Sequence, residues 1–457
     1  MKKLVALLLC LMMVVPATLA SAETAEGKVL NIWCWNDEFQ SRFNAYYPEV
    51  KEIAEDKSTT TLNDGTIVKW TINPNEGNNY QNKLDEALRA QESAAADDKI
   101  DIFLIEADYA LKYVDSPYTL DVKADIGLTD EDLGGQYKYT QEIATSADGK
   151  LKAVTWQATP GLFAYRRSIA KDVLGTDDPD AVQEALSDWD KFNAVAEQAA
   201  AKGYYMLSGY DDAYRTFSNN VSAPWVADDG ETVVVDANLM KWVDQTKTYT
   251  DKGYNHKSSL LDATWAADQG PTGKVFGFFY STWGINFTLL GNSLETSVAN
   301  GGKEEVGNGA YGDYAVCQGP QAYYWGGTWI CGAAGSDNLE TIKDVMLKLT
   351  CDEAIMKQIT MDTQDYTNNE KAMNEIASSD YKSDFLGGQN HIALFAEAAT
   401  KIDMSNAGPY DQGLNESLQN AFKDYFTGTV DEDTAKANFE TAIKEKYPEL
   451  TDVVWPA

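Results

Sequence analysis

The stretch DGKLKAVTWQATPGLFAYRRSIAKD, Asp148 to Asp172, predicts how the whole chain is organised. Lys150 to Trp156 alternates polar and apolar residues, a pattern that predicts a β-strand. Pro160 interrupts this pattern, because proline has no backbone N–H to donate to a sheet. A second extended run from Leu162 to Tyr165 leads into a short predicted helix. This order is expected where a chain leaves one domain and begins the next, and a ligand cleft usually lies at such a junction.

The first residues, Met1 to Ala22, have the features of a secretory signal peptide. Two lysines precede an apolar run from Leu4 to Val15, and Ala20-Ser21-Ala22 forms a small-residue cleavage site. The apolar run is shorter than the roughly 20 residues that cross a bilayer. Cys10 lies in the middle of this run, which argues against lipid attachment there. We therefore expect an exported protein, located in the periplasm or at the outer face of the cytoplasmic membrane.

The composition argues against several classes of protein. The chain of 457 residues has 71 acidic and 37 basic side chains, so its surface should repel nucleic acid and anionic lipid. With only His256 and His391 present, a histidine-rich metal site or a Ser-His-Asp triad is not expected, and we predict no metal or cofactor. The cysteines after the signal peptide match no zinc pattern, and their pairing cannot be deduced from sequence: Cys34, Cys317, Cys331 and Cys351.

Two polar clusters follow predicted strands early in the chain. The strand from Lys28 to Trp33 runs into Trp35 and the polar residues Asn36, Asp37 and Glu38. The strand from Ile100 to Ile105 runs into Glu106 and Asp108. Alternation of strands and helices here predicts α/β structure with a mostly parallel sheet. Open α/β sheets bind ligands at the carboxyl ends of their strands, so the clusters are candidates for one crevice. The alternative is that these residues are helix caps and solvated turns.

Two later segments interrupt the pattern with paired glycines. Tyr323 to Ile330 is the densest aromatic segment, and its Gly326-Gly327 pair lets the backbone bend or another group approach closely. We interpret this segment as a second crossing between domains, and Phe385 to Gln389, with its own Gly-Gly pair, as a third. Between them, Val275 to Tyr280 predicts a strong strand that leads directly to Trp283.

Tryptophans beside carboxylates and amides suit the recognition of a neutral sugar. Carboxylates and amides pair with hydroxyl groups, while a tryptophan ring covers the apolar face of a sugar and keeps a polar N–H. Several of the 12 tryptophans follow strands and do not recur at helical spacing, and for these we favour a binding role: Trp35, Trp283, Trp325 and Trp329. Trp156, Trp225 and Trp265 are balanced between binding and packing, and Trp156 is kept as a candidate. Trp189 and Trp242 are expected in the core.

In this succession of features the chain resembles the family 1 extracellular solute-binding proteins, the maltose-binding-protein-like receptors of carbohydrate ABC importers. The features are the signal peptide, the Trp-Asn-Asp turn, the acidic turn after Asp101-Ile-Phe-Leu, the Asp148 to Arg167 segment, the Trp283-Gly284 turn and the glycine-rich aromatic third of the chain. The likeness covers essentially the whole mature chain, and it is the order of these features, more than any single motif, that carries it.

The resemblance implies a type II periplasmic-binding-protein-like fold. Each of two lobes would have a mostly parallel sheet flanked by helices, and three crossovers would join the lobes. We expect a signal peptide at 1–22, lobe 1 at 27–158 plus 331–385, and lobe 2 at 159–330 plus 386–457. The protein would be a monomer that delivers a sugar or oligosaccharide to permease subunits without covalent chemistry.

The resemblance also implies a set of ligand contacts. Trp35, Asn36 and Asp37 match the first binding loop, and Glu106 and Asp108 match the second. Asp212 and Tyr214 match a polar-aromatic turn of the other lobe, Trp283 matches its stacking tryptophan, and Tyr410 matches the turn before the penultimate helix. Together with the aromatic crossing, the predicted ligand-binding set is Trp35, Asn36, Asp37, Glu106, Asp108, Trp156, Asp212, Tyr214, Trp283, Trp325, Gly327, Trp329 and Tyr410.

Two other functions remain open at this stage. A secreted glycoside hydrolase also needs two carboxyl groups around a sugar, about 5–10 Å apart. A receptor for polyamines or other cations would use the carboxylates as counter-charges and the aromatic rings as a cation–π box. One departure from the family concerns membrane attachment: its members in Gram-positive organisms usually begin with a lipid-modified cysteine, whereas this chain has Ala22-Glu23.

Overall fold

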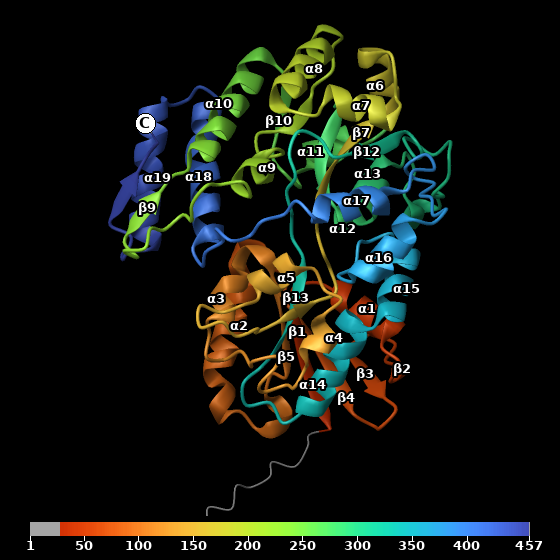
Figure 1. Cartoon of the computed structure of the whole chain (residues 1–457), viewed down its shortest axis with the longest axis vertical. Helices are drawn as coiled ribbons and strands as arrows, with labels where there is room; N and C mark the ends of the chain where they lie inside the picture. Colours follow the sequence, from red (N-terminus) through yellow and green to blue (C-terminus); the bar gives the residue numbers. More distant parts are fainter. Residues whose placement is uncertain (1–27, 457) are drawn as a thin grey trace, which may run out of the picture.

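The computed structural model describes residues 28–456, which form two lobes with separate β-sheets (Figure 1). The lower lobe in Figure 1 contains the beginning of the described chain, and the upper lobe contains its end. The predicted signal peptide and Cys10 lie outside the described residues. Within the described residues no helix is both long enough and apolar enough to span a membrane.

The first lobe is built on a seven-stranded sheet in the order β2-β3-β4-β1-β5-β13-β6. Strand β5, which lies between β1 and β13, is buried along almost its whole length, with Ile102, Phe103, Leu104 and Ile105 each at most 1% exposed. The strands are β1 (Val29–Cys34), β2 (Val50–Ile53), β3 (Thr59–Leu62), β4 (Ile67–Ile72), β5 (Ile102–Glu106), β6 (Val154–Thr155) and β13 (Thr328–Gly332).

This sheet is mixed, so the prediction of a mostly parallel sheet is wrong in this detail. β1 runs parallel to β4 and β5, while the other described pairs in the sheet are antiparallel. Short turns join β2 to β3 and β3 to β4, and such hairpins require antiparallel strands. β13 arrives from the second lobe at the carboxyl end of β5, where Thr328 lies opposite Glu106, so it must run backwards along β5.

Amphipathic helices cover the first sheet. In α2, for example, Tyr80, Leu84 and Leu88 recur at helical spacing and are buried, while the opposite face is solvated. The longer helices associated with this lobe are α1 (Glu38–Tyr46), α2 (Asn79–Ala90), α3 (Ala110–Val114), α5 (Lys138–Ile143), α14 (Leu339–Met346), α15 (Glu353–Thr363) and α16 (Glu370–Ala377).

The second lobe has a small antiparallel sheet in the order β11-β7-β12, extended by shorter strand pairs. All six residues of its central strand β7 are buried. The strands of this lobe are β7 (Gly161–Arg166), β8 (Leu207–Gly209), β9 (Thr232–Val234), β10 (Asn255–Ser258), β11 (Gly277–Ser281), β12 (Tyr314–Cys317) and β14 (Asp452–Val454). Here too the expected parallel sheet is not found, although β8 with β10 and β9 with β14 are parallel pairs.

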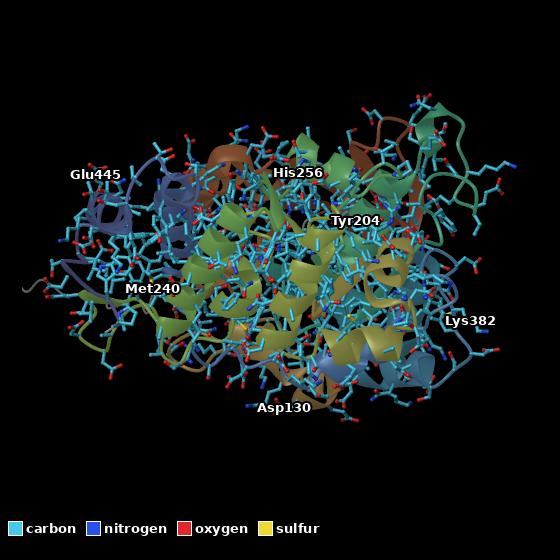
Figure 2. The ribbon with its side chains drawn as sticks, turned by 90° about the horizontal axis from the view of Figure 1, so that it is seen from above. Asp130, Tyr204, Met240, His256, Lys382 and Glu445 are labelled. Atoms are coloured by element: carbon cyan, nitrogen blue, oxygen red, sulfur yellow. The ribbon has the colours of Figure 1, made fainter. Side chains whose placement is uncertain are left out.

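Helices pack around this second sheet, and α12 and α17 lie on its side toward the first lobe (Figure 1). Viewed from above, Lys382 and Glu445 lie at opposite ends of the lobe (Figure 2). The helices are α6 (Arg167–Leu174), α7 (Pro179–Ala185), α8 (Trp189–Ala201), α9 (Tyr214–Ser218), α10 (Ala237–Lys252), α11 (Ala263–Asp268), α12 (Thr282–Gly284), α13 (Leu290–Ser293), α17 (His391–Ala399), α18 (Asp411–Phe426) and α19 (Glu432–Lys446).

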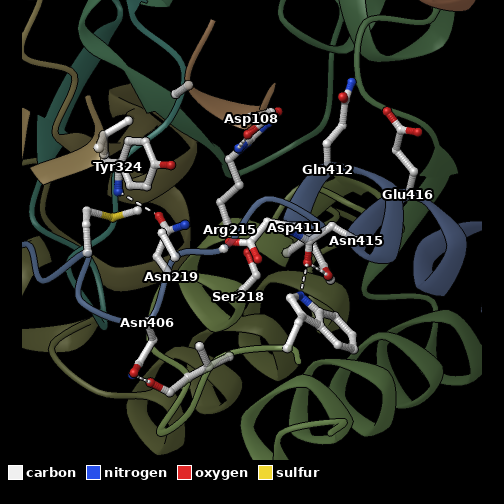
Figure 3. A pocket seen from close by; sticks show the side chains of 18 of the residues that line it. Asp108, Arg215, Ser218, Asn219, Tyr324, Asn406, Asp411, Gln412, Asn415 and Glu416 are labelled. Carbon is white, nitrogen blue, oxygen red and sulfur yellow. Dashed lines mark hydrogen bonds and ion pairs between the residues drawn. The ribbon is translucent and has the colours of Figure 1, made fainter. Parts of the chain in front are cut away.

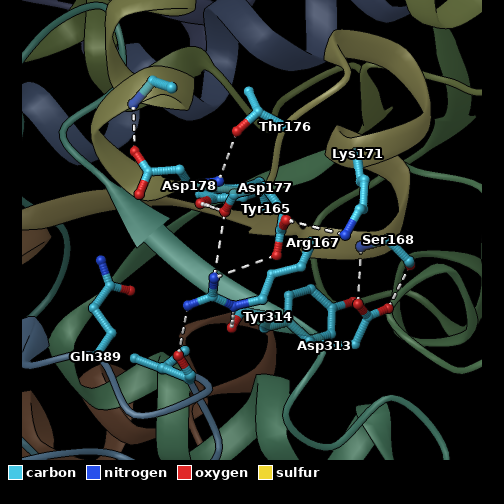
Figure 4. A network of polar contacts seen from close by, with 12 residues as sticks. Tyr165, Arg167, Ser168, Lys171, Thr176, Asp177, Asp178, Asp313, Tyr314 and Gln389 are labelled. Atoms are coloured by element: carbon cyan, nitrogen blue, oxygen red, sulfur yellow. Dashed lines mark hydrogen bonds and ion pairs between the residues drawn. The ribbon is translucent and has the colours of Figure 1, made fainter.

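Arg167 ties β12 and the chain's last entry into the second lobe to the start of α6 (Figure 4). Its Nε donates to the carbonyl oxygen of Tyr314 at 3.1 Å, and its Nη2 donates to that of Leu386 at 3.0 Å. Nearby, Gln389 exchanges two side-chain hydrogen bonds with the backbone of Val316 in β12. The segment predicted as the third crossing is therefore held on the second lobe.

The first two crossings run antiparallel and are hydrogen-bonded to each other. The backbone N–H of Trp325 donates to the carbonyl oxygen of Thr159 at 3.0 Å, and the N–H of Gly161 donates to that of Tyr323 at 2.7 Å. The hydroxyl of Thr159 donates to the carbonyl oxygen of Gly326 at 2.7 Å. The second crossing ends at Thr328, where β13 begins. Residues 328–330 already pair with β5, so the return to the first lobe comes three residues earlier than the predicted boundary at Cys331. The remaining lobe boundaries stay predictions.

The four cysteines that the structure describes are free thiols: Cys34, Cys317, Cys331 and Cys351. Burial raises the pKa of Cys34 and of Cys317 to about 12, so both remain protonated at neutral pH.

The paired crossings predict a strong effect of Gly161→Ala. A Cβ at this position would overlap the ring of Tyr323, which is itself buried. We expect the free energy of unfolding to fall by about 1–3 kcal/mol, the usual cost of overpacking. Gly291→Ala is the matched control, because a Cβ there meets no atom within 4 Å and lies in helix α13. Urea unfolding of both variants tests this, and equal stability would contradict the packing described here.

Candidate functional site

A cleft between the lobes contains two neighbouring compartments. The first, which we call the tryptophan compartment, is lined by Trp35, Asn36, Glu38, Glu106, Gln157, Trp283, Phe287, Trp325, Gly326, Gly327 and Thr328. These residues come from the carboxyl ends of β1 and β5, from the first two crossings and from the turn after β11. The second, the acidic compartment, is lined by residues of both lobes, including Asp108, Tyr214, Arg215 and Asp411 (Figure 3).

The tryptophans of the first compartment are held by neighbouring rings. Trp35 makes edge contacts with Tyr80 and Tyr109, at centroid distances of 5.7 and 6.2 Å. Trp283 and Trp325 meet edge to face at 5.1 Å, and Nε1 of Trp283 donates to the carbonyl oxygen of Trp325 at 3.1 Å. Trp35 and Trp283 remain partly exposed, so their rings are available to a ligand.

Gly326 and Gly327 allow the second crossing to approach Trp283. Their φ angles of 76° and 111° lie in the left-handed region that favours glycine. A Cβ at Gly326 would lie 2.9 Å from Nε1 of Trp283. The glycine pair therefore forms part of the wall of the compartment.

An ion pair between the lobes separates the two compartments. Arg215 of α9 makes two hydrogen bonds to the carboxylate of Asp108, at 2.8 and 2.6 Å, and its guanidinium lies 5.5 Å from the ring centroid of Trp325. Burial works to raise the pKa of Asp108, but the charge of Arg215 holds it below its ordinary value. Glu106, whose carboxylate accepts from the Asp108 N–H at 2.8 Å, has its pKa raised by burial and by the Asp108 charge.

Glu38 is a second carboxyl in the tryptophan compartment; the sequence placed it in the polar cluster after the first strand, but the predicted ligand-binding set did not include it. Nε2 of Gln157 donates to Glu38 at 3.1 Å and to buried Asp365 at 3.0 Å. Oε1 of Gln157 accepts from the N–H of Thr328 at 3.1 Å, so this amide joins both crossings to the two acids. Burial, reinforced by the charge of Asp365, raises the pKa of Glu38 to about 7.

The sequence also did not identify Phe287, Gln157 or Arg215 as residues of the site. Phe287 is 75% exposed in a short π-helical turn at the edge of the tryptophan compartment. Arg215 lines the acidic compartment. The sequence offered only position as a signal: Arg215 follows the Asp212 turn, and Gln157 lies inside the stretch that predicted the first crossing.

The structure brings together most of the predicted residues. Those that line the tryptophan compartment are Trp35, Asn36, Glu106, Trp283, Trp325 and Gly327. Asp108 and Tyr214 line the acidic compartment, where the Tyr214 hydroxyl and Nε1 of Trp225 both donate to Oδ1 of Asn415. Asp37 is exposed and lines neither compartment.

The remaining predicted residues lie elsewhere, and three of them are core residues. Trp156 is 1% exposed and stacks on Phe39 at 5.3 Å. Trp329 is also 1% exposed, and its Nε1 donates to the carbonyl oxygen of Thr140 at 2.9 Å. Asp212 accepts from the N–H groups of Ser208 and Gly209 and so closes a turn. Tyr410 donates to Glu449.

These positions correct the predictions for Trp156, Trp329 and Asp212, because packing and backbone pairing already occupy these side chains. Between residues 28 and 456, no group of three or more His, Cys, Asp or Glu side chains is arranged to hold a metal ion.

The sequence matches the family model described as bacterial extracellular solute-binding protein over residues 57–386. The chain belongs to this family of bacterial extracellular solute-binding proteins, which confirms the predicted resemblance. A search of curated proteins by sequence finds no match.

Several solved structures share the fold. An extracellular solute-binding protein family 1 structure is similar over 92% of this chain and 99% of its own, with a TM-score of 0.69 and 15% identity. The ABC transporter associated binding protein from B. animalis subsp. lactis Bl-04 is similar over 93% and 100%, with a TM-score of 0.65 and 16% identity. The galacto-N-biose-/lacto-N-biose I-binding protein of the ABC transporter from Bifidobacterium longum is similar over 93% and 98%, with a TM-score of 0.64 and 13% identity. The predicted two-lobed α/β fold is confirmed.

The raised pKa of the partly buried Glu38 predicts a specific pH dependence of stability. Because its pKa in the folded protein is raised from 4.5 to about 7, its stabilising contribution is complete below pH 4.5 and is lost as the pH rises through 7. We expect the free energy of unfolding to fall less steeply between pH 5 and pH 8 in Glu38→Gln than in the wild type. Glu55→Gln, at an exposed position, is the control. Parallel wild-type and Glu38→Gln curves in urea unfolding would show that Glu38 ionises normally.

Proposed function

We propose that this protein binds a neutral sugar or oligosaccharide outside the cytoplasm and delivers it to the permease subunits of an ABC importer. The observation that carries the proposal is the tryptophan compartment. It combines partly exposed indole rings with the carboxyl, amide and backbone groups that hydroxyls need, and no Lys or Arg lines it. Trp283 would stack on the sugar while Glu106 and Asn36 pair with its hydroxyls from the first lobe.

The raised pKa values suit a neutral ligand. A carboxyl group that keeps its proton can donate a hydrogen bond to a hydroxyl as well as accept one, and it avoids placing an unpaired charge against an uncharged ligand. Burial is the main cause of the raised pKa values of Glu38 and Glu106. Similar structures support the same class of ligand: one is in complex with β-1,6-galactobiose, one with lacto-N-biose and one with α-D-tagatose.

Binding would involve rotation of the lobes about the paired crossings. Hinges of this kind absorb the change in φ and ψ at a few residues between rigid elements. Arg215–Asp108 would then be a contact of the closed form, because it joins the two lobes directly. We infer that the protein works as a monomer at the outer face of the cytoplasmic membrane or in the periplasm.

Replacing Trp283 should separate binding from folding. We expect Trp283→Ala to weaken sugar affinity by about 30-fold, the scale of a hot-spot side chain, with little change in melting temperature. Trp156→Ala is the comparison, and it should lose about 3–5 kcal/mol of stability because its ring is packed in the core. Calorimetric affinity and thermal unfolding of both variants test this. A large loss of stability in Trp283→Ala with unchanged affinity would make Trp283 a packing residue.

The absence of catalysis is a separate prediction. Glu38 and Glu106 line one compartment and both have raised pKa values, so the glycoside hydrolase alternative still deserves a direct test. We expect purified protein to leave a panel of oligosaccharides intact over prolonged incubation, as followed by chromatography of the products. Sustained cleavage that disappears in Glu106→Gln would reassign the protein as a hydrolase.

A further inference from the structure

The acidic compartment carries a large excess of negative charge. Among the described residues, Arg215 is its one basic lining side chain, whereas five carboxyl groups line it: Asp108, Asp211, Asp403, Asp411 and Glu416. Asp108 takes up the charge of Arg215 through two hydrogen bonds. The compartment therefore disfavours an anionic ligand and is suited to a cationic one.

Most of the remaining carboxyl groups have partners of their own. Asp211 accepts from the N–H of Leu260 at 2.9 Å, and Asp403 accepts from the N–H of Ser405 at 2.9 Å. Glu416 lies 3.4 Å from Nζ of Lys446. These contacts account for three of the four carboxyl groups that Arg215 does not neutralise.

Asp411 is the exception. It is the first residue of α18, and its Oδ1 is shielded from solvent and has no hydrogen-bond partner within residues 28–456. Figure 3 shows Asp411 between Arg215 and Asn415. Burial raises its pKa to about 7. A carboxyl oxygen that is buried without a partner favours either a retained proton or a bound cation, because an unpaired buried charge is costly.

The surroundings favour an organic cation over a metal ion. Within the described residues, no three carboxyl, thiol or imidazole groups are arranged for metal coordination. The compartment instead offers side-chain amides from Asn219, Asn406 and Gln412 and aromatic surface from Trp225 and Tyr324. Amides and rings of this kind suit the hydroxyls and carbon skeleton of a sugar-like ligand.

We propose that the acidic compartment binds the ammonium group of an amine-bearing saccharide, with Asp411 as its counter-charge. This inference rests on the proposed function, since the sugar itself would occupy the tryptophan compartment. The ion pair lies between the two compartments, because Arg215 contacts Asp108 and lies over the ring of Trp325, which lines the tryptophan compartment. A saccharide that extends from one compartment to the other would pass beside this ion pair.

The experiment compares matched sugars. Calorimetric titration at pH 7 would use glucosamine, galactosamine and the β-1,4 glucosamine disaccharide beside their neutral counterparts glucose, galactose and cellobiose, with spermidine as a cation that carries no sugar. We expect at least one amine to bind about tenfold more tightly than its neutral counterpart, the effect of one additional partly buried charge pair. Asp411→Asn should abolish that preference. Asp433→Asn, an exposed position on α19, matches the change in net charge and should preserve it.

A measurement on the wild type does not depend on the folding of any variant. At pH 6.5, below the raised pKa of Asp411, this carboxyl group largely carries a proton while an amino sugar is mostly an ammonium ion, so binding of the ammonium group should release protons from the site. Titrations in phosphate and imidazole buffers, which differ in ionisation enthalpy, measure this release. Amine binding without proton release would overturn the role of Asp411.

The outcomes distinguish this inference from the proposed function. Neutral sugars that bind as tightly as every amine partner overturn the inference and leave the proposed function intact. Failure of every amine to bind overturns it as well. Binding of spermidine alone, lost in Asp411→Asn, would support the cationic compartment while contradicting the proposal that the ligand is a sugar.

Discussion

The structure depends on the hydrogen bonds between its first two crossings. Thr159 and Gly161 on one strand pair with residues 323–326 on the other, so the two connections between the lobes form one antiparallel unit. At one end this unit enters the sheet of the first lobe through β6 and β13, and at the other end it enters the second lobe through β7. Two bonded strands resist shear more than separate linkers do, so the rotation of the lobes that we propose would take place about them.

The same unit builds part of the ligand site. Gln157 uses its amide to hold the second crossing at Thr328 and the acids Glu38 and Asp365 on the first lobe. Gly326 and Gly327 then form a wall against which Trp283 rests. The same residues therefore support the proposed hinge and form the cleft. A substitution that weakens the contacts between the crossings should also change the shape of the cleft.

Electrostatics divide the cleft into regions of different character. Burial raises the pKa values of Glu38, Glu106 and Asp411, because each carboxyl group has lost more hydration than its hydrogen bonds replace. Asp108 is the contrast, since it is equally enclosed but paired with Arg215, and its pKa is lowered. One arginine from the second lobe thus decides which carboxyl group in the cleft is firmly ionised, and it separates a compartment suited to neutral groups from one suited to cations.

The sequence by itself determined the α/β class, the family, the first two crossings and six of the residues that line the tryptophan compartment. It could do so because strand periodicity, chain breaks at proline and glycine, and polar residues after strands are local signals. It could not decide which tryptophans face the cleft: Trp156 and Trp329 follow the same local pattern as Trp283, yet Phe39 and Thr140, far away in the chain, enclose them in the core. Strand direction was likewise decided by the tertiary structure, because β13 enters its sheet from the other lobe. The ion pair joins Asp108 to Arg215, which lies 107 positions later in the chain. Asp411, whose Oδ1 has no hydrogen-bond partner among the described residues, lies 196 residues beyond Arg215. Only the folded chain brings these charges into one cleft.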